Sequence, residues 1–255
     1  MEIVYLIAFF ILGTFMGSFL TVIGIRLPIH EDFIKSRSHC DSCNHKLSLL
    51  DMVPIISYLV LRRKCRYCHE KIDSLSTYME LFTGILFALS YIAFGFSYEL
   101  FIGLGIVCLL IIIAVSDTSY YIIPDEVLIF FTGYFLIINT LNKGVMNSLF
   151  CILSGIAMFG IMYSIMILGN IMFRKESLGG GDIKLMFVVG IVLHPFLGLL
   201  VIFIASILAL PMSLILIIKN KKNLIPFGPF LVISFMFVYF TRIDINTIVN
   251  YIKSI

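Results

Sequence analysis

The sequence predicts an all-α polytopic membrane protein with about eight transmembrane helices, and three observations lead to this fold class. Hydrophobic residues make up 60% of the 255 residues and charged residues only 13%, whereas a soluble domain has about 25% charged and 45–50% apolar residues. The apolar residues form separate runs along the whole chain, and the basic residues gather between them. Because so much apolar surface must face lipid, disordered, collagen-like and disulfide-scaffold classes are excluded.

Runs of about 20 apolar residues are long enough to cross about 30 Å of hydrocarbon as helices. The runs 127–141 and 184–195 are short for a full crossing, and a kink at His194-Pro195 within one long helix would reduce the count to seven. Helices are predicted because the alternating pattern of barrel strands is not seen. The predicted spans are 3–25, 78–96, 99–116, 127–141, 148–173, 184–195, 196–218 and 225–241.

The basic residues predict the orientation of these spans. Nine of the 18 lie in one polar segment, 26–77, which the positive-inside rule places in the cytoplasm. With eight spans, the later basic clusters fall on the same side and both termini on the other. These clusters are Arg174, Lys175 and Lys184, then Lys219, Lys221 and Lys222. The net charge of +3 is therefore a topology signal, and no nucleic-acid partner is predicted, because no basic face with base-reading residues is seen.

The chain is predicted to divide into two regions. Residues 1–77 hold the first transmembrane helix and the cytoplasmic polar segment, and residues 78–255 form a transmembrane core.

Two Cys-x-x-Cys pairs lie in the polar segment: Cys40 with Cys43, and Cys65 with Cys68. Each pair can present two thiolates from a tight turn, so the four cysteines predict a closed tetrahedral Cys₄ site for a structural zinc ion. Zinc would order a segment that has few large apolar groups. Neighbouring histidines are interpreted as solvated side chains or as neighbours of the ligands, because four thiolates complete the shell. The alternatives are two disulfides, which a reducing cytoplasm disfavours, a dithiol redox centre, another metal, or no metal.

Acidic residues at the rim of a membrane span are costly and point to function. Asp117 follows an apolar run at the predicted cytoplasmic end of the third span. Asp182 follows Gly179, Gly180 and Gly181 at the predicted cytoplasmic start of another, so both carboxylates are expected at the same depth. Consecutive glycines permit positive φ and the close approach of another backbone. The alternative for Asp182 is that it only N-caps its helix.

Two aspartates held close together cannot both ionise easily, so one keeps its proton. Such a dyad can activate a water molecule with one carboxylate and protonate a peptide carbonyl with the other. No His-Glu-x-x-His metallopeptidase pattern competes with this interpretation. Glu80 and Glu99 are not predicted to be catalytic. Glu80 lies near the cytoplasmic entrance of the second span, where it could pair with a basic residue of the polar segment or contribute to a site.

In their order and spacing these residues resemble the type IV prepilin peptidase family. The matching segments are Gly17-Ser18-Phe19-Leu20, Arg26-Leu27-Pro28, the two Cys-x-x-Cys pairs, Pro54-Ile55-Ile56-Ser57-Tyr58-Leu59, Leu61 to Cys68, Glu80, Asp117 with Ile123-Pro124-Asp125, and Gly179 to Lys184.

The resemblance implies a membrane aspartic endopeptidase with Asp117 and Asp182 as its catalytic dyad. Gly179, Gly180, Gly181, Lys184 and Asp125 would shape the site. Such enzymes remove the basic leader of prepilins and pseudopilins, the substrates of pilus, secretion and competence systems, after a glycine at the cytoplasmic face of the cell membrane. The longer members also methylate the new N-terminal amine with S-adenosylmethionine, and they carry an N-terminal Cys-rich region as this chain does. The acidic pair Asp125-Glu126 is expected to meet the charge of the leader.

Two other functions stay open at this point. The chain could be an aspartic peptidase that does not methylate its product. It could also be a zinc-stabilised transporter or channel whose aspartates bind or relay cations, although repeat symmetry, which is typical of transporters, is not seen in the sequence.

Overall fold

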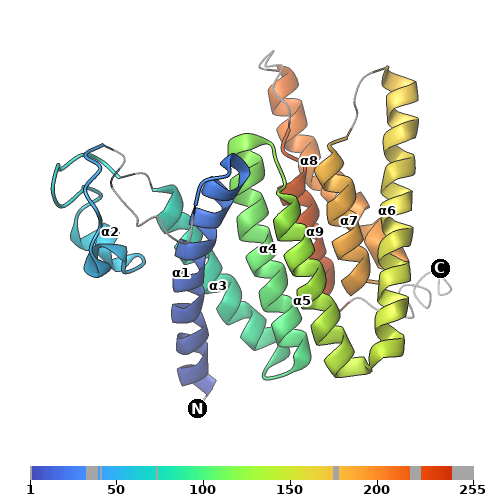
Figure 1. The fold of residues 1–255 in the computed structure, drawn as a ribbon, viewed down its shortest axis with the longest axis horizontal. Coiled ribbons are helices and arrows are strands. Elements are labelled where there is room, and N and C mark those ends of the chain that lie inside the picture. Colours follow the sequence, from blue (N-terminus) through green and yellow to red (C-terminus); the bar gives the residue numbers. More distant parts are fainter. Residues whose placement is uncertain are drawn as a thin grey trace. The chain divides into compact units, whose positions relative to one another are not determined.

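The computed structural model describes residues 2–32, 40, 42–72, 74–174, 178–218 and 225–242. The described residues form helices, with an isolated β-bridge between Lys64 and Lys71 and no strand among them, so the all-α prediction is confirmed (Figure 1). Lys175, Lys219, Lys221 and Lys222, used above for the orientation, lie outside the described residues. The helices are α1 (Glu2–Arg26), η1 (Leu27–Ile29), η2 (Leu49–Met52), α2 (Ile56–Val60), α3 (Leu75–Phe94), α4 (Tyr98–Tyr120), α5 (Asp125–Lys143), α6 (Val145–Phe173), α7 (Gly180–Val192), α8 (Pro195–Ile218) and α9 (Gly228–Phe240).

Five helices of the described chain are long and apolar enough to cross a membrane: Glu2–Ile29, Leu75–Phe94, Tyr98–Tyr120, Val145–Met172 and Pro195–Ile215. This makes the chain a multi-pass membrane protein. The other three predicted spans form helices α5, α7 and α9. Helices α7 and α9 have 13 residues each, or about 20 Å, which is short of the about 30 Å of hydrocarbon. The count of eight spans therefore stays a prediction.

The segment 184–218 is not one kinked helix. Helix α7 ends at Val192 and α8 begins at Pro195, with Leu193 extended between them. Proline cannot donate a backbone hydrogen bond but fits the first turn of a helix, so Pro195 starts a new helix here.

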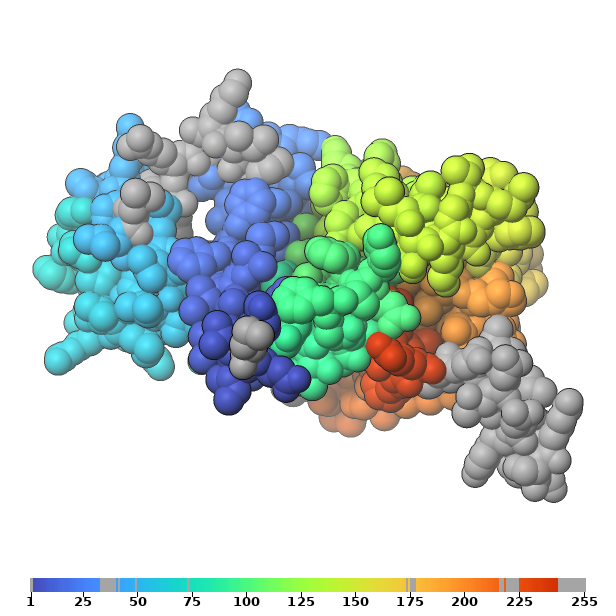
Figure 2. All heavy atoms as spheres, turned by 90° about the horizontal axis from the view of Figure 1, so that it is seen from below, coloured from blue at the N-terminus to red at the C-terminus, as the bar shows by residue number. Residues whose placement is uncertain are grey.

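The chain folds into two compact units, Met1–Leu100 and Phe101–Ile255. In the first unit α1 packs along α3, and glycines permit this close approach: a Cβ on Gly13 would lie 2.8 Å from the Cα of Gly84, and one on Gly17 would lie 2.9 Å from the Cα of Glu80. Aromatic rings also join the start of α1 to the end of α3. In Figure 2 the dark-blue start of α1 lies against the green end of α3. The rings are Tyr5, Phe9, Tyr91 and Phe96.

In the second unit the short helix α7 contacts α5, α6, α8 and α9. Its residues are buried on most sides, and a Cβ on Gly190 would lie 2.8 Å from the Cα of Gly155 in α6. Because protein surrounds α7, it does not need the length of a lipid-facing span. This buried helix carries Asp182 in its first turn.

Candidate active site and candidate metal centre

Asp117 lies in the last turn of α4 and is only 6% exposed. Its Oδ2 atom accepts a hydrogen bond of 3.0 Å from the backbone N–H of Gly228, the first residue of α9. The first N–H groups of a helix have no partner within the helix, so the start of α9 supplies a donor to this carboxylate. A Cβ on Gly228 would lie 3.0 Å from Oδ2, which explains the glycine at this position.

Asp182 is the third residue of α7 and is 8% exposed. Its carboxylate accepts a hydrogen bond from the backbone of Gly179. The interpretation of Asp182 as the N-cap residue is wrong, because Gly179 occupies that position and Asp182 reaches back to it from inside the first turn. This hydrogen bond uses part of the acceptor capacity of the Asp182 carboxylate.

The three glycines before Asp182 do not adopt positive φ; in the described chain only Gly95 and Gly144 do so among glycines. Close approach is seen at one of them: a Cβ on Gly181 would lie 2.9 Å from the Cβ of Ile123, whereas one on Gly180 would meet nothing within 4 Å. The two neighbouring glycines therefore differ in what they permit.

Ile123 brings the surroundings of the two aspartates together. A Cβ on Gly181, the residue before Asp182, would contact the side chain of Ile123. A Cβ on Gly228, whose N–H donates a hydrogen bond to Asp117, would contact the same side chain. The two carboxylates are near enough to repel one another electrostatically. Two buried carboxylates in this relation favour a shared proton, which suits acid–base chemistry on one water molecule.

Lys184 and Asp125 form an exposed ion pair beside this site. The Nζ atom of Lys184 lies 2.8 Å from Oδ1 and 2.6 Å from Oδ2 of Asp125, so the pair joins the N-terminal part of α7 to the first residue of α5. The charge of Asp125 is therefore already met within the chain. The exposed Glu126 next to it remains as the acidic side chain that could face a basic partner.

The four predicted cysteine ligands lie together in the first unit, with their Sγ atoms all within 4.8 Å of one another. The Sγ atoms of Cys40 and Cys68 are 3.8 Å apart. In a tetrahedral zinc site with Zn–S bonds of about 2.3 Å, two sulfur atoms are about 3.8 Å apart, so the donor set fits zinc. Cys65 is buried and the others are partly or fully exposed.

The two Cys-x-x-Cys turns have the same backbone hydrogen bonds. In the first, Asn44 N–H donates to the Cys40 carbonyl (2.8 Å) and Cys40 N–H to the His45 carbonyl (3.0 Å). In the second, His69 N–H donates to the Cys65 carbonyl (3.0 Å) and Cys65 N–H to the Glu70 carbonyl (2.8 Å). Such turns aim both thiols of a pair to one side.

The environment of Cys40 favours a thiolate ligand. Backbone N–H groups of Cys43 and Ser42 bond to its sulfur and lower its pKa to about 6. His45 is not among the clustered donors. Its ring contacts that of Tyr67 at a tilt of 35°, with centroids 3.6 Å apart, and so connects the two turns.

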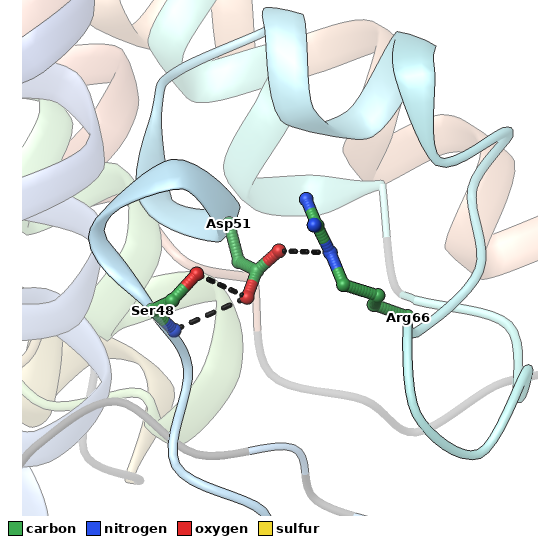
Figure 3. Close-up of polar contacts among 3 residues, drawn as sticks. All are labelled: Ser48, Asp51 and Arg66. Carbon is green, nitrogen blue, oxygen red and sulfur yellow. Dashed lines mark hydrogen bonds and ion pairs between the residues drawn. The ribbon is translucent and has the colours of Figure 1, made fainter.

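An ion pair holds the second turn against helix η2 (Figure 3). Asp51 Oδ2 accepts hydrogen bonds from the backbone N–H (3.1 Å) and hydroxyl (2.7 Å) of Ser48, and Oδ1 lies 2.8 Å from Nε of Arg66. Burial opposes ionisation of Asp51, but these hydrogen bonds and the guanidinium outweigh it and lower its pKa. Arg66 lies between Cys65 and Cys68, so Asp51 fixes the second turn.

Sequence reasoning missed three contacts at these sites: Gly228 at Asp117, Asp51 at Arg66, and the backbone of Ile55 at Glu80. The first had a signal, because Pro226-Phe227-Gly228-Pro229 predicts a helix start, where free N–H donors are found. The other two join segments by single polar contacts that have no sequence pattern.

Comparison with known proteins gives two family matches. Residues 11–94 match the bacterial peptidase A24 N-terminal domain, and residues 104–214 match the type IV leader peptidase family. The chain is similar to prepilin leader peptidase/N-methyltransferases: 36% identical to one from Bacillus subtilis over 72% of either chain, 32% to one from Myxococcus xanthus over 71% of this chain and 54% of that protein, and 33% to one from Vibrio cholerae over 94% of this chain and 98% of that protein. No solved structure matches.

Proposed function

Since this chain belongs to the type IV leader peptidase family, we propose that it is a membrane aspartic endopeptidase that removes the leader of prepilins or pseudopilins and then methylates the new N-terminal amine. The observation that supports the peptidase assignment is that Asp117 on α4 and Asp182 on α7 are both buried, and that glycines next to each of them approach the same side chain, Ile123.

Asp117 and Asp182 would divide the chemistry of peptide cleavage between them. The ionised carboxylate takes a proton from a water molecule, and the water oxygen attacks the carbonyl carbon of the scissile bond. The protonated carboxyl donates to the carbonyl oxygen. As the C–N bond then breaks, the carboxyl that took the proton from water gives it to the departing amine, and the other carboxyl takes its proton back from the carbonyl oxygen. The N–H of Gly228 holds one oxygen of Asp117 and so orients that carboxylate.

The substrate would be cut at the cytoplasmic face of the cell membrane. A precursor with a basic leader and an apolar helix places its scissile bond at the boundary between water and lipid, where water is available for hydrolysis. Asp182 lies at the first turn of α7 and Asp117 at the last turn of α4, so both are at helix ends. Asp125 is paired with Lys184, so the exposed Glu126 next to it is the acidic side chain that would meet the basic leader.

Methyl transfer would depend on the N-terminal region. The bacterial peptidase A24 N-terminal domain match covers residues 11–94 and thus the four cysteines, and the similar proteins carry N-methyltransferase in their names. S-adenosylmethionine would supply the methyl group. Zinc would be held by Cys40, Cys43, Cys65 and Cys68, whose four thiolates complete a structural site.

A single experiment tests both activities. The purified full chain is incubated with a prepilin and S-adenosylmethionine, and mass spectrometry records the new N-terminus and the mass of its first residue. We expect a cut after glycine and one added methyl group. A cut product with a free amine would restrict the function to proteolysis. Cation flux in proteoliposomes without any cleavage would instead identify a transporter or channel.

The two glycines before Asp182 give a matched pair of variants. Gly180→Ala meets nothing within 4 Å and should raise the free energy of unfolding by up to about 1 kcal/mol, because alanine favours helix, with cleavage unchanged. Gly181→Ala would push Ile123 and should lower the cleavage rate by about tenfold, since small displacements of catalytic groups are costly. Rates of prepilin cleavage and thermal unfolding measure both effects. Equal cleavage by the two variants would contradict the role of Ile123 in placing the aspartates.

A further inference from the structure

Glu80 is a buried carboxylate that the cleavage mechanism does not use. It lies in the second turn of α3 and is 6% exposed. Its Oε2 accepts a hydrogen bond of 2.9 Å from the backbone N–H of Ile55, and its Oε1 one of 3.2 Å from the hydroxyl of Ser76. In the described chain no basic side chain forms an ion pair with it, so the expected pairing with the polar segment is not seen. A buried carboxylate held only by neutral donors is costly and calls for a reason.

The backbone at Ile55 is strained. Ile55 has φ 61° and ψ −50°, and the N–H of Ile56 donates to the carbonyl of Pro54, which closes a three-residue γ-turn. This positive-φ form of the γ-turn is rare, and a β-branched residue in it is an outlier. Such a conformation persists only where its surroundings hold it. Glu80 does so, because it accepts the N–H at the centre of the turn.

The turn leads without interruption to the second cysteine pair. Helix α2 starts at Ile56, and Leu59 N–H donates to the Ile55 carbonyl. The following turn has two arginines with positive φ, Arg62 and Arg63, and ends in the bridge that begins at Lys64, next to Cys65. Each step is closed by a backbone hydrogen bond, so the direction of the chain at Ile55 determines where Cys65 lies.

We propose that Glu80 is a positioning residue for methyl transfer: its carboxylate on the membrane helix α3 holds the γ-turn at Ile55 and thereby fixes the segment that carries Cys65 and Cys68. This inference rests on the proposed function, in which the Cys-rich region serves methylation and the two aspartates serve cleavage. Glu80 acts through the backbone of Ile55 and not on the substrate.

Three variants of the full chain test this role. Glu80→Ala removes the acceptor and should lower the rate of methylation of cleaved prepilin by about tenfold or more, with cleavage unchanged. Glu80→Gln keeps an oxygen that can accept the Ile55 N–H and should retain most methylation. In Glu80→Ala with Ile55→Gly, methylation should return, because glycine adopts positive φ without steric cost and no longer needs to be held.

The readouts separate this role from chemistry at Glu80 and from failure of the proposed function. Methylation and cleavage rates are measured on the same samples, together with the rate at which a chelator removes zinc, which should rise in Glu80→Ala and return in the double variant. Ser76→Ala, which loses only the 3.2 Å hydrogen bond, is the matched control and should methylate as the wild type does.

Wild-type methylation by Glu80→Ala would overturn the proposal. So would loss of methylation in Glu80→Gln without rescue by Ile55→Gly, because both results would show that the γ-turn is not what Glu80 serves. If Glu80→Ala loses cleavage as well, recovery of both activities in the double variant supports the proposal and failure to recover overturns it. A wild-type protein that cleaves but never methylates would refute the proposed methyl transfer itself.

Discussion

Replacing Asp117 or Asp182 by Asn is expected to reduce prepilin cleavage by at least about 1000-fold, the range seen when an acid or base that acts in the transition state is removed. Asparagine has nearly the same shape, and in Asp117→Asn its oxygen can still accept the Gly228 N–H. What it loses is the ability to carry or release a proton. The rate of leader removal by the purified variants, followed by mass spectrometry, measures the loss.

Asp125→Asn is the matched control for these two variants. Asp125 is also an aspartate close to the site in sequence, but it is exposed and pairs with Lys184. Exposed ion pairs contribute little, about 0–1 kcal/mol, so cleavage should change by less than about fivefold. The dyad would be wrong if either buried aspartate could be replaced with cleavage intact. Loss in Asp117→Asn alone would reduce Asp182 to a residue that caps α7.

The helices could be predicted from the sequence because long apolar runs have few other solutions in lipid. Their ends were less accessible. The run that starts at 184 leaves out Gly180, Gly181 and Asp182, yet α7 begins at Gly180, and the carboxylate of Asp182 accepts a hydrogen bond from the backbone of Gly179 at the start of this helix. Asp117 was expected to end its helix, but α4 continues to Tyr120. Hydropathy finds the apolar part of a helix, and not its polar ends.

The two candidate sites differ in how much the sequence could predict. The spacing of Cys-x-x-Cys pairs already dictates a common ligand position, and the structure brings the four sulfur atoms together. The aspartates are far apart in the chain, and the proposed dyad depends on the packing of α4, α7 and α9, which no local spacing dictates. The contacts that hold both sites, at Gly228 and at Ile55, use backbone N–H groups, which every residue except proline has. Only the contact at Gly228 had a sequence signal, the helix start predicted by the two prolines around it, and no residue pattern identifies the contact at Ile55.

Replacing Cys65 by Ser is expected to abolish methyl transfer while prepilin cleavage continues. Cys65 is the most buried of the four cysteines, at 2% exposed, and a serine there cannot supply the thiolate that zinc binds. Zinc affinity should fall by at least about 100-fold, because the loss of a residue that only orients a metal ligand already costs about 10–100-fold. Metal content of the purified protein, and methylation and cleavage of the same prepilin, measure the three effects.

Cys151→Ser provides the control for that variant. Cys151 lies in α6 outside the cluster, so its replacement should leave metal content and both activities unchanged.

A chelator applied to the wild type should reproduce the loss of methylation, and added zinc should restore it. The segment has too few buried apolar side chains to fold alone, so the bound ion would order it. The four cysteines and the two aspartates belong to different compact units, which is why the two activities should separate. Methylation that survives in the metal-free Cys65→Ser protein would show that this region serves another purpose.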